Sequence, residues 1–328
     1  KLKATYFKDK LRMKVLKKIL IDTDPGMDDT LAIILGAKSS KTELLGVSSV
    51  AGNYPIEITT KNVLKTLELI GRPDIPVAKG MHKPLTRPLP NDPFSHGSDG
   101  MGEIFLPEPT TKISNKHGVD QIIDVVRANP GEVTVICIAP LTNLAMAIMK
   151  EPQLVEEVKE VVCLAGSFGL NRYAFENATG DNPQAEWNVY VDPEAAKLVF
   201  NSGIPLRAIG LDVATCTNLD KNQLYSLKNS SRKEANIAEK MVRYVESRGH
   251  ESYCVLIDSM AVAAVLEPSL IEMIEVRVGI ETKGELTLGQ TIADFRKHHA
   301  WEHLPKIKVA LKANYKRFID VLMENILR

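Results

Sequence analysis

The chain has 328 residues, of which 44% are apolar and 25% are charged. A sequence of this size and composition can bury a large core, so we expect one large α/β domain or two closely fused ones. Lys plus Arg and Asp plus Glu both number 41, so no net field favours nucleic acid or an acidic membrane surface. A small, neutral or weakly charged substrate fits this balance better.

The four cysteines are scattered and form no CxxC pair, which is typical of reduced thiols in a cytosolic protein. No apolar run approaches the roughly 18 residues of a membrane span, so we expect no membrane segment and a cytoplasmic location. The first dozen residues are basic and lack the apolar core of a secretory signal. We interpret residues 1–12 as an extension before a natural start at Met13, and 13–328 as the folded domain.

Apolar runs short enough for buried strands alternate along the chain with segments of helical period. The first strands are expected at 18–21, 44–48, 133–138, 161–165 and 206–210. Helices are expected between them, at 28–37, 56–70, 118–128, 141–149 and 193–201. This alternation predicts an α/β fold in which crossover helices join the strands of a mostly parallel sheet.

The pattern changes after residue 221. Two polar helices come first, followed by a helix at 259–266, strands at 274–280 and 307–311, and a closing helix at 315–327. Two stretches, 83–98 and 168–183, are longer than compact connections normally are. We predict that both are binding loops or lids.

The strongest local signal is the segment DTDPGMDD, where an apolar strand runs into Asp22, Asp24, Asp28 and Asp29. Four carboxylates in eight residues repel one another unless a cation lies among them. Helix capping by Asp28 or Asp29 explains two of the four and leaves Asp22 and Asp24 unexplained. Because all candidate ligands are oxygens, the pattern indicates Ca²⁺ or Mg²⁺.

The same residues allow a second interpretation. The strand that ends in Asp22-Thr23-Asp24 resembles the opening motif of the haloacid-dehalogenase-like phosphatases, in which the first Asp is the nucleophile and Mg²⁺ assists. The immediate Asp28-Asp29 pair is not part of that motif, and the helix begins too early for a cap insertion.

DTDPGMDD also resembles the N-terminal signature of the inosine-uridine preferring nucleoside hydrolases. Further blocks of that family follow in the same order, namely VAGN, SHGSDGMG, APLTNLA, AEWN with DPEAA, and IDSMA. The resemblance covers roughly residues 15–325. It implies a single α/β domain with a mainly parallel sheet, and an enzyme that splits ribonucleosides into free base and ribose.

The resemblance also implies the roles of individual residues. Asp24, Asp29, Asp258 and the carbonyl of Leu141, with Thr142 as the alternative, would hold one Ca²⁺, and Asp24 would act as general base toward a Ca²⁺-bound water. The substrate-binding residues would be Asp28, Asn53, His96, Glu186 and Asn188. We further expect a homodimer or homotetramer.

Two positions depart from the family. Many members have a histidine before the late aspartate that is thought to protonate the leaving base, and Ile257 stands there. Gly180 stands where a ribose-contacting Asn is expected, with Asn177 or Asn182 nearby. Candidates to replace the missing acid are Tyr244, Arg248, His250 and Tyr253.

These departures leave alternatives open. The chain could hydrolyse a different ribosyl compound, or bind nucleosides with weak turnover. Trp187 is either a core aromatic or a platform for the base. The base preference stays open.

Overall fold

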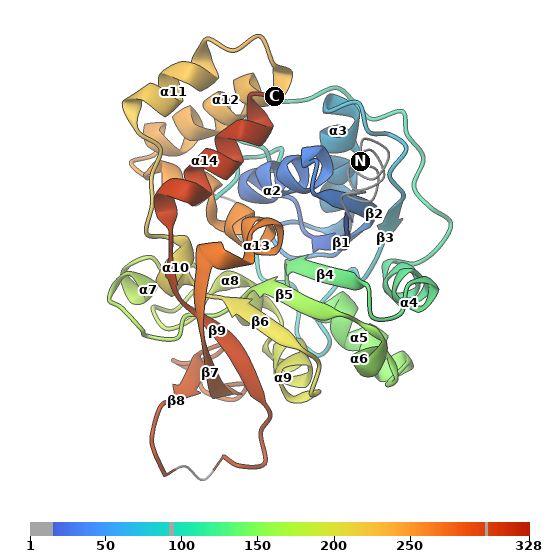
Figure 1. Cartoon of the computed structure of the whole chain (residues 1–328), viewed down its shortest axis with the longest axis vertical. Coiled ribbons are helices and arrows are strands. Elements are labelled where there is room, and N and C mark those ends of the chain that lie inside the picture. Colours follow the sequence, from blue (N-terminus) through green and yellow to red (C-terminus); the bar gives the residue numbers. More distant parts are fainter. Residues whose placement is uncertain (1–15, 92–94, 299–300) are drawn as a thin grey trace, which may run out of the picture.

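A sheet of nine strands runs through the residues that the structure describes, in the order β3-β2-β1-β4-β5-β6-β9-β7-β8. The structure is a computed structural model that describes residues 16–91, 95–298 and 301–328 (Figure 1). The predicted extension at 1–12 and the start at Met13 lie outside these residues.

The first six strands are parallel to their neighbours. They are β1 (Lys17–Thr23), β2 (Thr42–Ser49), β3 (Val77–Lys79), β4 (Val133–Ile138), β5 (Glu160–Leu164) and β6 (Leu206–Ile209). β9 (Lys306–Ala313) continues the parallel set beside β6, whereas β7 (Ile271–Ile280) is antiparallel to both β9 and β8 (Thr291–Asp294). The prediction of a mostly parallel sheet in one α/β domain is confirmed.

Helices cover both faces of the sheet (Figure 1). Side chains of β1 alternate between two cores, because Ile19 and Ile21 point to one face and Leu20 to the other. The first core is closed by α2 (Met27–Lys38), α3 (Ile56–Leu69), α10 (Leu211–Ala214), α11 (Lys221–Lys228), α12 (Lys233–Ser247), α13 (Ile257–Leu266) and α14 (Tyr315–Ile326). The second is closed by α4 (Gly118–Ala128), α5 (Thr142–Lys150), α6 (Leu154–Glu157) and α9 (Pro193–Asn201).

The predicted helices and strands lie close to the observed ones, with differences of a few residues at their ends. The helix expected at 259–266 begins two residues earlier, at Ile257, which places Asp258 in its first turn. The short elements β3, β8, α6, α7 (Tyr173–Glu176), α8 (Trp187–Val191) and α10 were not predicted.

The chain reverses its direction across the sheet at β1. From β1 it proceeds to β2 and β3 on one side, and it then returns to β4 on the other side. The carboxyl ends of β1 and β4 therefore flank a crevice, which is where open α/β sheets bind their ligands. The connections after β1, β2 and β4 all start at this edge.

In the described part of the chain, no helix has the length and apolar character required to cross a membrane.

Candidate active site

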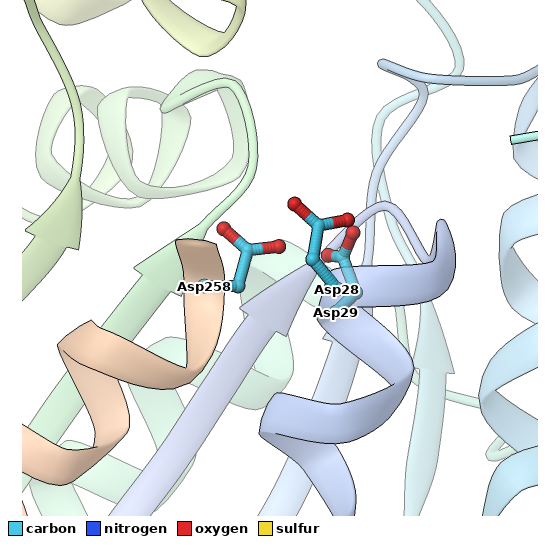
Figure 2. A group of neighbouring side chains, drawn as sticks. All are labelled: Asp28, Asp29 and Asp258. Carbon is cyan, nitrogen blue, oxygen red and sulfur yellow. The ribbon is translucent and has the colours of Figure 1, made fainter. Parts of the chain in front are cut away.

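Three buried carboxylates meet above the carboxyl ends of the central strands. Asp28 and Asp29 belong to the first turn of α2, and Asp258 to the first turn of α13. Oxygens of the three side chains lie within 4.8 Å of one another, and Figure 2 shows them converging from the two helices. Since α2 and α13 pack against each other, two segments far apart in sequence build one acidic cluster.

Asp29 is held by donors from the turn that precedes α2. Its Oδ1 accepts from the Thr23 hydroxyl at 2.6 Å and from the Asp24 amide at 3.2 Å, and its Oδ2 accepts from the Gly26 amide at 3.0 Å. The Asn53 side chain donates to Oδ2 at 3.4 Å. The carboxylate therefore fixes the turn between β1 and α2.

Asp24 follows β1 directly and is fully buried. Its Oδ2 accepts from the backbone amide of Asn53 at 2.6 Å, while its Oδ1 has no hydrogen-bond partner among the described residues. A Cβ at Gly52 would lie 2.0 Å from Asp24 Oδ2 and 2.7 Å from Pro140 Cδ. Only glycine lets the loop after β2 approach Asp24 this closely, a role for Gly52 that no sequence pattern indicated.

Below the acidic cluster, hydrogen bonds hold the buried carboxylate of Asp22. Asp22 Oδ1 accepts from the Ser48 hydroxyl at 2.6 Å and from Asn143 Nδ2 at 2.8 Å. These bonds join β1, β2 and α5 beneath the site. They give Asp22 a structural role that the sequence did not reveal, through Oδ1 alone, since its Oδ2 is buried without a partner among the described residues.

The carboxyl groups raise one another's pKa. Burial is the main cause, and neighbouring carboxylates add to it for Asp24, Asp29 and Asp258. The pKa of Asp24 and of Asp258 lies well above the usual range, and the pKa values of Asp28 and Asp29 rise to about 6. Within residues 16–91, 95–298 and 301–328, no Lys or Arg forms an ion pair with these groups. No lysine or arginine of the described residues therefore offsets the charge of the cluster.

The donor set fits a hard cation. Every donor is a carboxylate oxygen, and Asp24 Oδ1 and Asp28 Oδ1 are buried without a hydrogen-bond partner in the described part of the chain. Ca²⁺ and Mg²⁺ prefer such oxygens. Asp24 is not in the group of three whose oxygens lie within 4.8 Å, whereas Asp28, expected at the ribose, is in it.

His96 lies beside the cluster in a fixed tautomer. Its Nδ1 accepts from the backbone amide of Met27 at 3.2 Å, so this nitrogen carries a lone pair. The same nitrogen lies 3.9 Å from Asp28 Oδ1. A Cβ at Gly26 would lie 2.7 Å from Nδ1, so glycine is needed for this contact.

A cavity of about 460 Å³ opens above the cluster, a size typical of small-molecule sites. Both predicted binding loops border it, through Ser95 and His96 in one and through residues 176–179 in the other. The expected site residues that line the cavity are Asp28, Asn53, His96, Asn188 and Asp258. Asp24, Asp29, Leu141 and Glu186 lie outside its lining.

Glu186 positions the start of α8. Its Oε1 accepts from the Asn188 amide at 2.7 Å, and its Oε2 accepts from the amides of Gly166 at 3.0 Å and Val189 at 3.1 Å. Burial raises its pKa to about 7. Asn188 is in turn tied to β5, because its Nδ2 donates to the Leu164 carbonyl at 3.1 Å. The arrangement presents Asn188 to the cavity.

Leu141 immediately precedes α5. Its carbonyl accepts from the Ala145 amide at 2.8 Å and so begins the helix. The Thr142 hydroxyl donates to Asp192 at 2.7 Å. The assignment of the Leu141 carbonyl as a metal ligand stays a prediction.

The departures from the family can be placed. Ile257 and Asn177 line the cavity. Asn182 does not line it: its Nδ2 donates to the Leu288 carbonyl, and its Oδ1 accepts from the Gln184 amide. Trp187 lines the cavity while only 7% of it is exposed.

Of the four candidates for the missing acid, His250 and Tyr253 line the cavity. The other two are not in its lining, and Arg248 donates to the Tyr244 hydroxyl at 2.9 Å.

Comparisons with known proteins agree with this arrangement. A sequence profile of the inosine-uridine preferring nucleoside hydrolases matches residues 19–320. Uridine nucleosidase 1 of Arabidopsis thaliana is 36% identical over 283 residues, 85% of this chain and 82% of the plant protein. The inosine-uridine preferring nucleoside hydrolase of Crithidia fasciculata is 35% identical over 318 residues, 95% of this chain and 98% of that protein.

A solved structure of a ribonucleoside hydrolase has a similar fold. The purine-preferring ribonucleoside hydrolase from Gardnerella vaginalis superimposes with a TM-score of 0.83 at 30% identity, over 94% of this chain and 98% of that one. The bases named for these three proteins differ, so similarity to them does not determine which base this chain prefers.

Proposed function

Since the chain belongs to the inosine-uridine preferring nucleoside hydrolases, and is thus a hydrolase of ribonucleoside N-glycosyl bonds, we propose that its acidic cluster holds Ca²⁺ and that Asp24 is the general base. The observation that carries this proposal is the convergence of Asp28, Asp29 and Asp258 within 4.8 Å. Buried carboxylates at this separation are stable together only when protons or a cation offset their charge. Above about pH 6, where Asp28 and Asp29 lose their protons, the cation is the proposed counter-charge.

Asp24, Asp29 and Asp258 are the proposed ligands, with the Leu141 carbonyl. Asp24 remains in this set because its buried Oδ1 has no partner among the described residues and Asp29 is the carboxylate that raises its pKa most. Asp28 lies in the donor group and also lines the cavity. Asp258 shares both properties and stays a ligand, whereas Asp28 is assigned to the ribose beside the cation.

Cleavage of the C1'–N bond passes through an oxocarbenium-like state, so negative charge near the sugar stabilises it. Asp24 accepts the proton of the attacking water, and the Asn53 amide that donates to its Oδ2 orients the carboxylate. Asn188, held by Leu164 and presented by Glu186, contacts the ribose hydroxyls together with Asp28. When bound, Ca²⁺ supplies positive charge that orients those hydroxyls and makes a nearby water more acidic.

The proposal extends to the substrate-binding role of His96 and to assembly. His96 lines the cavity beside Asp28, on the loop that contains the SHGSDGMG block.

Family resemblance alone supports a homodimer or homotetramer. Light scattering of the purified protein measures that state directly.

The activity is tested by measuring free ribose after incubation with inosine, uridine, cytidine and adenosine, each with Ca²⁺ and with a chelator. We expect release from at least one nucleoside, and its loss on chelation. Saturable nucleoside binding without ribose release would instead support a binding protein with weak turnover, the alternative favoured by Ile257 in the cavity wall. A phosphate ester assay tests the phosphatase alternative.

A further inference from the structure

The cavity has a buried end and an exposed end, which indicates where the two halves of a nucleoside lie. At its floor are Asp28 and Asp258, both buried. Tyr253, Cys254 and Asn177 are half-buried, and His250 and Glu176 are exposed at the rim. Because the carboxylates take the ribose end, the base lies toward the rim, against Ile257 and the residues after α12. Any group that protonates the base must come from this outer part.

His250 is fixed at the rim by the end of α12. Gly249 adopts a left-handed conformation with φ of +82°, which glycine adopts without strain. The backbone then turns back, and the His250 amide donates to the Val245 carbonyl at 3.0 Å. This turn ends the helix and places the imidazole on the cavity wall.

The titratable groups that share the cavity with His250 are Asp28, His96, Glu176, Tyr253, Cys254 and Asp258. On its own segment, Arg248 and Glu251 flank it. Arg248 donates to Tyr244, and Glu251 accepts from Asn218 at 2.7 Å. Both flanking charges are therefore held by other partners.

The other groups are poorly suited to protonating a base. Asp28 and Asp258 belong to the acidic cluster, and His96 stands beside it with Nδ1 bonded to Met27. The Tyr253 hydroxyl donates to Asn177 Oδ1 at 2.9 Å. Burial raises the pKa of Tyr253, and it raises that of Cys254 to about 11, so neither gives up a proton readily near neutral pH. Glu176 is exposed and lies 3.6 Å from Arg172.

We propose that His250 is the general acid that protonates the departing base, in place of the imidazole that is absent at Ile257. Imidazole is suited to this task because it exchanges protons near neutral pH. As the C1'–N bond breaks, its electron pair goes to the base, which takes the proton of the His250 imidazolium. The water oxygen bonds to C1', and its proton goes to Asp24. Solvent at the rim then returns a proton to His250, and Asp24 releases one.

The test compares two classes of riboside, and it rests on the proposed function. The His250→Gln variant and the parent are assayed with the best natural nucleoside and with nitrophenyl riboside, whose leaving group needs no proton. We expect His250→Gln to lower turnover of the natural nucleoside by about 100-fold. Turnover of the nitrophenyl riboside should remain nearly unchanged, and the fall of the natural rate at alkaline pH should disappear.

Three controls make the result specific. His82→Gln replaces a histidine outside this cavity and should change neither rate. Adding Ile257→His to His250→Gln should restore part of the lost rate on the natural nucleoside. Tyr253→Phe should not show the leaving-group selectivity.

Equal losses on both ribosides, or no loss on the natural one, would overturn the role of His250. The same holds if Tyr253→Phe alone shows selective loss. A Ca²⁺-loaded parent that cleaves neither riboside overturns the proposed function itself, and this inference with it.

Discussion

Asp24 has two proposed roles, as a metal ligand and as the general base, and a single substitution can separate them. Its Oδ2 is held by the Asn53 amide, and its Oδ1 has no partner among the described residues. Asp24→Asn keeps an oxygen and the shape of the side chain but removes the base. We expect kcat to fall by about 10²- to 10⁴-fold with little change in KM, measured as ribose release at saturating Ca²⁺. Near-normal turnover would show that another group accepts the proton.

Gly52 sets how closely the loop after β2 approaches that carboxylate. In Gly52→Ala, the new Cβ would lie 2.0 Å from Asp24 Oδ2, so the carboxylate or the loop must shift. We expect weaker Ca²⁺ binding and lower kcat, measured by calcium titration and ribose release. The matched control is Gly279→Ala in β7, where the nearest atoms belong to Trp301 at 3.1 Å. Equal activity of both variants would contradict this role of Gly52.

At the level of single residues, the sequence predicted much of the candidate site, because its polar residues stand in short blocks that resemble those of a known family. Asp28, Asn53, His96, Asn188 and Asp258 all reach the cavity. It could not predict Gly52, because the need for glycine arises from contacts with Asp24 and Pro140, which come from other loops at this edge of the sheet. Nor could it place Asp28 within the donor group, since that depends on how α13 packs on α2.

At the scale of elements, an ion-pair network joins the end of α13 to α14. Arg317 makes two bonds to Glu267, at 2.6 and 2.9 Å, and Lys41 also donates to Glu267. These partners lower the pKa of Glu267 to about 2. Because α13 carries Asp258, the network holds one helix of the site in place.

Glu267→Gln removes the charge from this network. The folded pKa of Glu267 is lowered, so its contribution to stability is present above the usual value near 4.5 and is lost as pH falls toward 2. We expect a loss of about 1 kcal/mol at pH 7 for this partly exposed network. Urea unfolding at pH 7 and pH 3 should show a smaller difference from the parent at pH 3. A difference independent of pH would show that packing, not charge, is responsible.

The prediction of helices and strands succeeded where a segment has a clear apolar period of its own. The long helices and buried strands have apolar periods that local sequence reveals. β3 has three residues and β8 four, and α8 is a single short helix whose start depends on the Glu186 cap. Such pieces are stable only against their neighbours, so their sequences alone do not reveal them.

For the whole molecule, the acidic cluster should couple stability to calcium. The pKa values of Asp28 and Asp29 rise to about 6, and that of Glu186 to about 7. A raised folded pKa contributes stability at low pH that is lost as pH rises through it. The chelated protein should therefore lose stability between about pH 4 and pH 7, from the usual carboxyl pKa to the raised ones. With Ca²⁺ bound, that loss should be smaller, because the cation replaces the protons.

Thermal unfolding at pH 5 and pH 8, with Ca²⁺ or a chelator, measures this coupling. At pH 8 and about a hundredfold excess of Ca²⁺ over Kd, we expect Tm to rise by about 4 °C. The gain should be smaller at pH 5. A Tm that is unaffected by chelation at both pH values would contradict a Ca²⁺ site at the cluster.

The order of the site residues along the chain also bears on how the protein is made. Asp24 and Asp258 are separated by 234 positions (258 − 24), and the cluster needs α13 packed on α2. A nascent chain that has left the ribosome as far as α12 therefore carries Asp24, Asp28 and Asp29 without their late partner. Calcium would bind such a chain weakly and would not guide its early folding. Its stabilising effect would begin only once translation has passed α13, so truncated translation products would remain unprotected and open to proteolysis.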